Sequence, residues 1–253
     1  MIVLGSIGST FSDAMRFIFE GEESSLGTVE VGGLGEISHL AGNHFLVCAV
    51  AMAVALLVSV PIALWLGHLG RAEFLAVGIA NVGRAVPPLA IIAFFVAFLG
   101  AGFRNVAFAL TLLAIPPILT NTYVGVRQVE RELVDAARGQ GMTEMQIVRQ
   151  IEMPLALPTI MSGIRISAVT VLATAIIAPE AGYDTLGTPI VAYNVYGTSG
   201  QVGAAIVVAL LTLAADGGLA AVQRIVTPKG LKIAGAKRTR RQPFLQIRRV
   251  DTP

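Results

Sequence analysis

The chain has 253 residues, of which 55% are hydrophobic and only 13% are charged, and its formal net charge is +2. An ordinary soluble domain carries about 25% charged residues, so this composition excludes one. Several uncharged runs are long enough to cross a bilayer, which takes roughly 20 apolar residues. We therefore expect an all-α polytopic membrane protein. The single cysteine, Cys48, excludes an internal disulfide.

The first 43 residues carry six acidic residues and one basic residue, Arg16, among many glycines. This leader, residues 1–43, is too polar to span a membrane. Two alternatives stay open for it: an amphipathic surface helix over residues 10–20, or a disordered segment. A basic n-region and a long apolar h-region are both lacking, so we expect no cleavable signal peptide.

Five membrane-spanning helices are predicted in the permease domain, residues 44–226. The first contains 22 consecutive residues without a charge, 45–66. At about 1.5 Å per residue this run is about 33 Å long, enough for a hydrocarbon core of about 30 Å. The predicted spans cover residues 44–67, 73–99, 104–126, 155–178 and 202–225.

The distribution of basic residues predicts the orientation. Residues 224–253 hold nine basic residues and one acidic residue, whereas the leader is acidic. Because basic residues collect on the cytoplasmic side, we expect the N-terminus outside and the basic tail, residues 227–253, inside. Opposite sides require an odd number of crossings, which agrees with five. The loop at residues 127–154 then lies inside, and the loop at residues 179–201 lies outside.

The inner loop, residues 127–154, is much longer than the connections of 2–8 residues that are usual between the helices of a bundle. Its sequence predicts a short helix over residues 130–138, ended by Gly139 and Gly141, because glycine is the usual residue where a helix stops and turns. The length favours an interaction surface over the alternative, a solvated connector that happens to be helical.

A second helix is predicted to start at Thr143, where Gln146 three residues later completes a capping box. Met142 and Ile147 stand at the hydrophobic positions that flank such a cap. An apolar stripe follows at Ile147, Val148 and Ile151. The polar face of this helix is predicted to carry Glu144, Arg149, Gln150 and Glu152. Pro154 and Pro158 predict that the chain changes course before it re-enters the membrane.

The same loop resembles a known family pattern. Permease subunits of binding-protein-dependent ABC importers share a loop with Glu-Ala-Ala, three residues, Gly, nine residues and Ile-x-Leu-Pro. Here the chain reads Asp135-Ala136-Ala137, then Gly141, then Ile151-Glu152-Met153-Pro154, with every spacing kept. Aspartate replaces glutamate at 135 and methionine replaces leucine at 153. The stretches "NTYVGVRQVERELVDAARGQGM" and "EMPLALPTIMSGIR" are similar to the osmoprotectant branch, and the resemblance covers residues 40–232.

The resemblance implies a five-helix core of the ABC importer permease type with a cytoplasmic coupling-helix loop. It implies import of a small compatible solute such as glycine betaine, choline, carnitine or proline by alternating access. The alternatives are an ABC permease for an amino acid or another small polar solute, and a secondary transporter. The same resemblance assigns docking of the ATPase to Asp135, Ala136, Ala137 and Gly141. It assigns to Ile151 and Pro154 the role of setting the geometry of the loop.

The partners that the resemblance implies are two copies of an ATP-binding subunit, a second permease that is identical or paralogous, and an extracytoplasmic substrate-binding protein. The chain has no Gly-Lys-Ser/Thr phosphate-binding loop, so we expect it not to hydrolyse ATP itself. ATP with Mg²⁺ is expected on the partner ATPase, and no cofactor or nucleic acid is expected on this chain. The expected location is the cytoplasmic membrane.

Three charges within apolar segments are candidates for the translocation path, because intramembrane charges usually face a bundle interior or water. Arg165 and Asp216 are each about nine residues from the inner end of their span, about 13 Å deep, which predicts that they pair or share a polar network. The alternative is that each reaches the interface separately. Arg84 precedes Pro87-Pro88, where it either meets a solute carboxylate or binds carbonyls freed by the prolines.

Other side chains carry weaker signals. Tyr183, Tyr193 and Tyr196 are compatible with an aromatic cage for a quaternary ammonium or with tyrosines of a membrane interface. The three histidines, His39, His44 and His68, lack the spacing of a metal site. No HExxH or GxSxG motif occurs, so an intramembrane enzyme is not expected.

Overall fold

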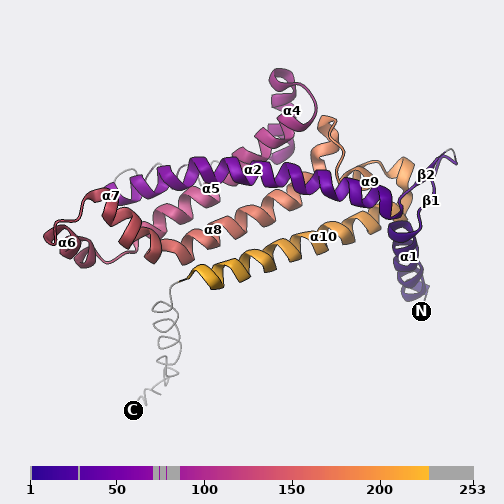
Figure 1. Ribbon diagram of the computed structural model, residues 1–253. Helices are drawn as coiled ribbons and strands as arrows, with labels where there is room; N and C mark the ends of the chain where they lie inside the picture. The colour runs from indigo at the N-terminus through magenta and orange to yellow at the C-terminus, as the bar shows by residue number, and fades with distance from the viewer. Residues whose placement is uncertain (1, 28, 71–73, 75–77, 79–85, 228–253) are drawn as a thin grey trace, which may run out of the picture.

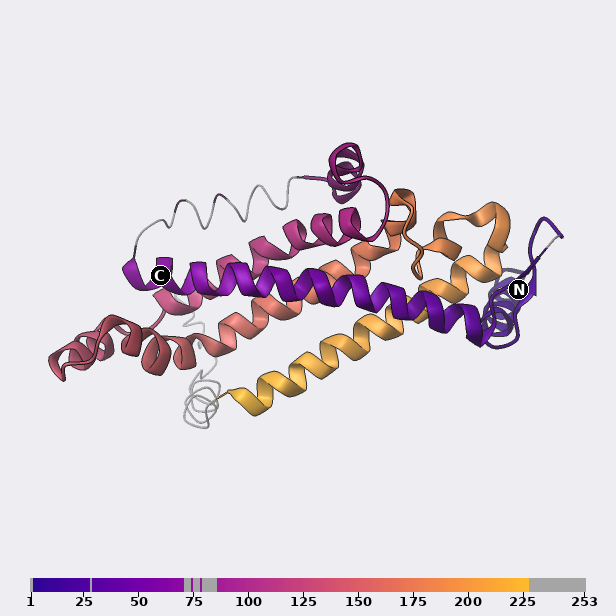
Figure 2. The same ribbon diagram turned by 45° about the horizontal axis from the view of Figure 1, so that its top comes forward.

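A computed structural model describes residues 2–27, 29–70, 74, 78 and 86–227. Within these ranges, four helical segments are long and apolar enough to cross a membrane. They run side by side along one axis (Figures 1 and 2). The four are α2 (Gly33–Leu69), α5 (Phe103–Arg127), the continuous run Glu144–Ala181, and α10 (Tyr193–Val226).

The second predicted span, residues 73–99, is described only in part. Its last 12 residues form the helix α4 (Pro88–Leu99). Pro88 is the first residue of α4, a position where the missing N–H of proline is harmless, so the proline pair starts a helix here. Apart from Phe74 and Gly78, residues 71–85 lie outside the described residues, and Arg84 is among them.

Two of the long helices begin earlier than their apolar content predicts. α2 starts at Gly33 and not at 44, and α10 starts at Tyr193 and not at 202, with a kink at Gly197, whose φ is 61°. The prediction followed charge-free runs, whereas a helix continues through polar residues once it has passed the hydrocarbon region. The third prediction, residues 104–126, agrees closely with α5.

The centre of the bundle is formed by α2, α5 and α8 (Met153–Thr174). Small residues allow the backbones to approach: a Cβ on Gly163 of α8 would lie 2.6 Å from Asn121 Cβ and 2.8 Å from the Pro117 carbonyl of α5. Such contacts are usual between membrane helices. Fully buried members of this core include Val47, Ala51, Leu110, Ile118 and Val171.

The leader forms ordered structure at one end of the bundle, so the disordered alternative is wrong. α1 (Ile2–Phe19) is followed by the two-residue strands β1 (Glu22–Glu23) and β2 (Glu30–Val31), which pair antiparallel. α1 crosses the end of α10 (Figure 1). Phe17 is fully buried there, in a hollow that α10 leaves at Gly200 and Gly203.

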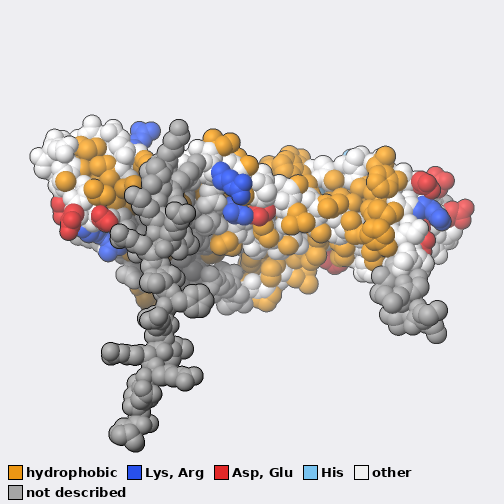
Figure 3. All heavy atoms as spheres, turned by 90° about the horizontal axis from the view of Figure 1, so that it is seen from below, with side chains coloured by type: hydrophobic (Ala, Val, Ile, Leu, Met, Phe, Trp, Pro, Cys, Tyr) orange, Lys and Arg blue, Asp and Glu red, His pale blue; other side chains and the backbone are white. Residues whose placement is uncertain are grey.

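The 3-10 helix η2 (Ala175–Ala181) and α9 (Thr188–Val191) lie at the same end as the leader. The hydroxyl of Thr185 donates to the Ala175 carbonyl, and fully buried Leu186 follows it, so the segment of residues 175–191 is folded back on the bundle. Acidic side chains gather at both ends of the molecule, with hydrophobic side chains spread between them (Figure 3).

Candidate functional site

The loop at residues 127–154 forms a helical elbow at the end of the bundle opposite the leader (Figure 1). α6 (Arg131–Gly139) is followed by Gln140 and Gly141 and then by α7 (Glu144–Ile147). Gly141 has a φ of 82°, which favours glycine, and a Cβ there would meet no atom within 4 Å. The predicted order of helix, glycine turn and second helix is confirmed.

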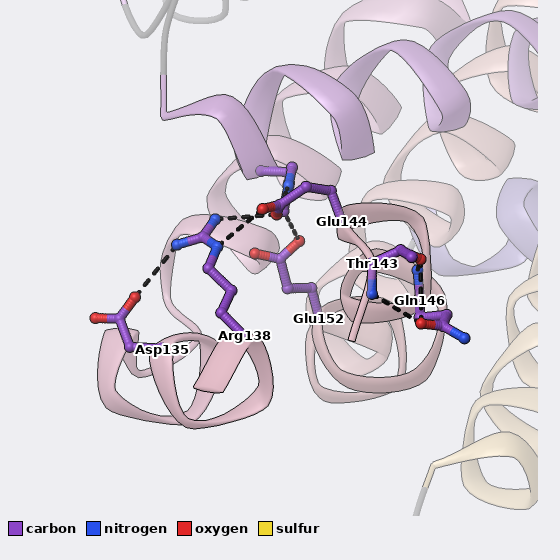
Figure 4. Close-up of polar contacts among 7 residues, drawn as sticks. Asp135, Arg138, Thr143, Glu144, Gln146 and Glu152 are labelled. Carbon is purple, nitrogen blue, oxygen red and sulfur yellow. Dashed lines mark hydrogen bonds and ion pairs between the residues drawn. The ribbon is translucent and has the colours of Figure 1, made fainter. Parts of the chain in front are cut away.

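The start of α7 is fixed by the predicted capping box. Gln146 N–H donates to Thr143 Oγ1 at 3.4 Å, and Thr143 N–H donates to Gln146 Oε1 at 2.8 Å (Figure 4). Two of the N–H groups that a helix start leaves unpaired are thereby bonded. The turn after Gly141 therefore leads into α7 at a defined residue.

A small apolar core holds the two arms of the elbow together. Ala137 of α6 is only 4% exposed and packs in a cluster with Val134 of the same helix and Ile147 of α7. Met142 and Ile151 also pack against this cluster, so both predicted hydrophobic positions beside the cap, Met142 and Ile147, belong to it. Asp135 and Ala136 stay exposed. Ala137 thus packs inside the elbow, whereas its neighbours Asp135 and Ala136 lie on the surface.

Pro154 does not end the helix, and the predicted change of course at this residue stays a prediction. α7 continues through a π-helical turn, η1 (Val148–Glu152), directly into α8, which contains both Pro154 and Pro158. In η1, Met153 N–H donates to the Val148 carbonyl, five residues back. The wider turn accommodates a proline, which has no N–H for the usual bond and would clash with the carbonyl four residues earlier.

Glu152 was predicted on the polar face of this helix, and that prediction is wrong because of the same π turn. This side chain is 2% exposed, and its Oε2 lies 2.8 Å from His68 Nδ1 at the end of α2. Residues eight apart in an α-helix differ by about 80° around the axis, but one residue inserted by a π turn reduces this to about 20°. Glu144 and Glu152 therefore both point toward α2.

His68 joins the two carboxylates. Its Nε2 lies 2.9 Å from Glu144 Oε2, while its Nδ1 contacts Glu152. The sequence did not predict this contact, because His68 and Glu152 are separated by 84 positions. The histidines were considered only as metal ligands, and their spacing does not fit a metal site. The only local signal was a histidine in the last turn of an apolar helix.

Arg138 links α6 to the same cluster (Figure 4). Its Nε and Nη2 donate to the two carboxylate oxygens of Glu144 at 3.0 and 3.1 Å, and its Nη1 donates to Asp135 at 3.2 Å. The hydrogen bonds to Glu144 raise the pKa of Arg138 above its ordinary value. A continuous chain of contacts therefore runs from Asp135 through Arg138 and Glu144 to His68.

Of the candidates for the path, the structure brings Arg165 and Asp216 together. Arg165 of α8 and Asp216 of α10 form an ion pair, and Arg165 Nη1 also donates to Gln223 Oε1 at 3.2 Å. Their predicted pairing is confirmed. Both side chains keep about a third of their surface exposed on one side of the bundle. Arg84 lies outside the described residues, so its role stays a prediction.

The three tyrosines considered for an aromatic cage have separate partners. Tyr183 packs edge-on against Phe103, with ring centroids 5.4 Å apart. Tyr196 donates to Glu36 at 2.6 Å, and the Tyr193 hydroxyl lies 3.4 Å from that of Thr198. Tyr183 and Tyr196 belong to different apolar clusters. In this structure the three rings do not converge on one cage.

Comparison with known families places most of this chain in one group. Residues 37–229 match the model of the family described as "Binding-protein-dependent transport system inner membrane component". The matched region begins in the first turns of α2 and includes the elbow and the whole of α10.

Curated proteins of similar sequence carry names from one branch. The chain is 35% identical over 199 residues to the glycine betaine/carnitine/choline transport system permease protein OpuCB of Bacillus subtilis, covering 78% of this chain and 92% of that protein. The choline transport system permease protein OpuBB of the same organism gives the same values. The carnitine transport permease protein OpuCB of Listeria monocytogenes is 36% identical, with 76% and 88% covered.

Solved structures with a similar fold include two inward-facing crystal forms of the MetNI methionine ABC transporter. The native form has a TM-score of 0.66 and covers 77% of this chain and 98% of that chain. The selenomethionine-soaked form has a TM-score of 0.65, with 74% and 94% covered. Both are 20% identical in sequence to this chain, so the likeness concerns the fold alone.

Proposed function

The chain belongs to the family of binding-protein-dependent transport system inner membrane components and is a permease subunit of an ABC importer, and we propose that it carries a small compatible solute. The named relatives, which transport glycine betaine, carnitine or choline, support this solute class. Proline is a further candidate within it. An amino acid outside this class is the competing candidate.

An ATPase and a substrate-binding protein are the partners that the family implies. In our proposal, two ATPase copies bind ATP with Mg²⁺ and drive the cycle, and a second permease, identical or paralogous, completes the pathway. The elbow then faces the cytoplasm, as its four arginines favour, and the leader lies outside.

The observation that carries this proposal is the exposed surface of the elbow. The side chains of Leu133 and Met145 are 45% and 54% exposed, and Ala136 and Asp135 are exposed beside them. Exposed apolar side chains on a polar helical projection are typical of a protein contact. We assign docking to Asp135, Ala136 and Gly141, with Leu133 and Met145 added.

The remaining members of the loop pattern are assigned to its geometry. Ala137 and Ile151 pack in the small apolar core between the arms, and Pro154 follows the π turn. For the path, we assign the exposed side of the Arg165–Asp216 pair to the route of the solute or to the contact with the second permease, because charges at membrane depth usually face one of these.

The test is uptake by the complete importer in a strain that lacks its own osmoprotectant uptake. Labelled choline, carnitine, glycine betaine and proline are compared with labelled methionine, with and without osmotic upshift. Accumulation of one of the first four that requires the ATPase subunit is expected. Uptake of methionine alone would assign another solute class, and uptake without the ATPase would contradict the importer mechanism.

A further inference from the structure

We propose that His68 is a positioning residue that joins the elbow to α2, so that movement of α6 is transmitted to this helix. The inference rests on the proposed docking of an ATPase at the elbow. The elbow is joined covalently to α5 and to α8, because it lies between them in sequence. Its connection to α2 depends on side chains instead, and His68, in the last turn of α2, supplies it.

Both ring nitrogens of His68 take part. Nδ1 lies 2.8 Å from Glu152 Oε2 and Nε2 lies 2.9 Å from Glu144 Oε2. Each ring nitrogen of a histidine can take part in a hydrogen bond, so this one side chain contacts both glutamates. One of the two carboxyl groups, that of Glu152, is buried.

The burial of Glu152 makes its contact with His68 costly to break. A buried carboxylate is costly unless it is paired, so separating the elbow from α2 would leave Glu152 without the imidazole. The π turn is the device that brings Glu152 into line with Glu144, since in an unbroken α-helix it would point about 80° away. A π turn in a long helix often marks a functional position.

The transmission from α6 has two steps. Arg138 of α6 binds both oxygens of Glu144, and Glu144 binds His68. A displacement of α6 therefore acts on the end of α2 through one guanidinium, one carboxylate and one imidazole. Charged pairs of this kind resist displacement more than neutral hydrogen bonds do.

Other groups surround the same end of α2. A Cβ on Gly70 would lie 2.9 Å from Arg127 Nη1 and 3.1 Å from Arg131 Nη2, so two guanidinium groups lie beside the helix end, where cations are favoured. The ring of Trp65 lies 5.7 Å from that of His68. These groups fix the surroundings of the helix end, and His68 makes the direct bonds to the glutamates of the elbow.

The experiment measures solute moved per ATP hydrolysed, in proteoliposomes that contain the complete importer and its substrate-binding protein. His68→Gln is compared with His39→Gln, a change at an exposed histidine of the same helix. The double variant His68→Gln/Glu152→Gln is included because the amide introduced by His68→Gln can donate to Glu144 and accept from the amide introduced by Glu152→Gln. ATPase binding to the permease is measured for each variant.

We expect His68→Gln to bind the ATPase normally and to lower solute moved per ATP by about fivefold or more, the lower range of site-to-site coupling. The double variant recovers most of this loss, and His39→Gln behaves as the unchanged protein. A merely structural role would reduce the amount of assembled complex and leave the ratio unchanged.

An unchanged ratio in His68→Gln, or a double variant no better than the single one, would overturn the inference while the proposed docking stands. If the unchanged permease does not bind the ATPase, the proposed function itself fails. Should His68→Gln not fold, Glu144→Ala replaces it, because this exposed change cuts the contact with Arg138 and leaves Glu152 paired. Glu144→Ala with normal coupling would then reject the inference, with exposed Glu132→Ala as its control.

Discussion

Arg165 and Asp216 bind each other through two parallel hydrogen bonds, from Nε to Oδ1 and from Nη2 to Oδ2, each 2.8 Å long. This two-pronged arrangement fixes direction as well as distance. Gln223 accepts a further bond from Arg165 and donates to the Pro158 carbonyl at 3.3 Å. The contact between α8 and α10 is therefore polar along part of its length, although both helices are mostly apolar.

The pair predicts rescue by charge exchange. Arg165→Asp and Asp216→Arg are each expected to lower the melting temperature of the detergent-solubilised protein, because each places two like charges in contact. The double exchange should restore most of the loss, as measured by thermal unfolding of the purified variants. A double variant that melts below both single variants would show that the ion pair does not hold the helices together.

The left-handed conformation of Gly141 predicts an effect that is specific to this glycine. An L-residue with a φ near 82° costs about 1–2 kcal/mol, so Gly141→Ala should disfavour the folded elbow and weaken ATPase binding by roughly tenfold. Gly139→Ala is the matched control, since Gly139 is helical and also has no atom within 4 Å of a Cβ. Equal binding by the two variants, measured by titration with the ATPase, would contradict the assignment.

The burial of Phe17 predicts that α1 stabilises the N-terminal end of α10. Phe17→Ala should destabilise this packing by about 3–5 kcal/mol, the usual loss for a buried phenylalanine. Phe11→Ala, at an exposed position of the same helix, should change stability little. Amide hydrogen exchange across α1 is the measurement. Unaltered protection in Phe17→Ala would mean that α1 is held by other contacts.

The close approach of α5 and α8 predicts a penalty for a single methyl group. Gly163→Ala should destabilise the bundle by about 1–3 kcal/mol, because the new Cβ lies too close to Asn121 and to the Pro117 carbonyl. Gly217→Ala in α10, where a Cβ meets nothing within 4 Å, should be neutral or slightly stabilising. Thermal unfolding separates the two, and identical melting temperatures would refute the packing argument.

Features set by neighbouring residues were predictable from the sequence. The capping box at Thr143 and Gln146 follows from residues three apart, and the glycine turn follows from the short-range preferences of Gly139 and Gly141. The pairing of Arg165 with Asp216 was predictable for a related reason, since helix rise alone puts them at the same depth.

Features that depend on distant contacts were not predictable in this way. The π turn at residues 148–152 shifts the helical phase by about one residue, so the polar face assigned by a regular period fails at Glu152. Its partner His68 comes from another helix, and no local pattern connects the two. Pro154 does not break the helix for a related reason, because the wider turn accommodates a residue that has no N–H.

The family match begins at residue 37, yet Phe17 fills the hollow at Gly200 and Gly203 from outside the matched region. The N-terminal end of α10 thus packs against a segment that precedes the matched region. In a chimaera of this chain with a relative, α1 and the paired strands β1 and β2 therefore need to come from the same protein as α10. If α1 alone were exchanged, the hollow at Gly200 and Gly203 of α10 would lose the ring that fills it. If α10 alone were exchanged, the ring of Phe17 would be left uncovered.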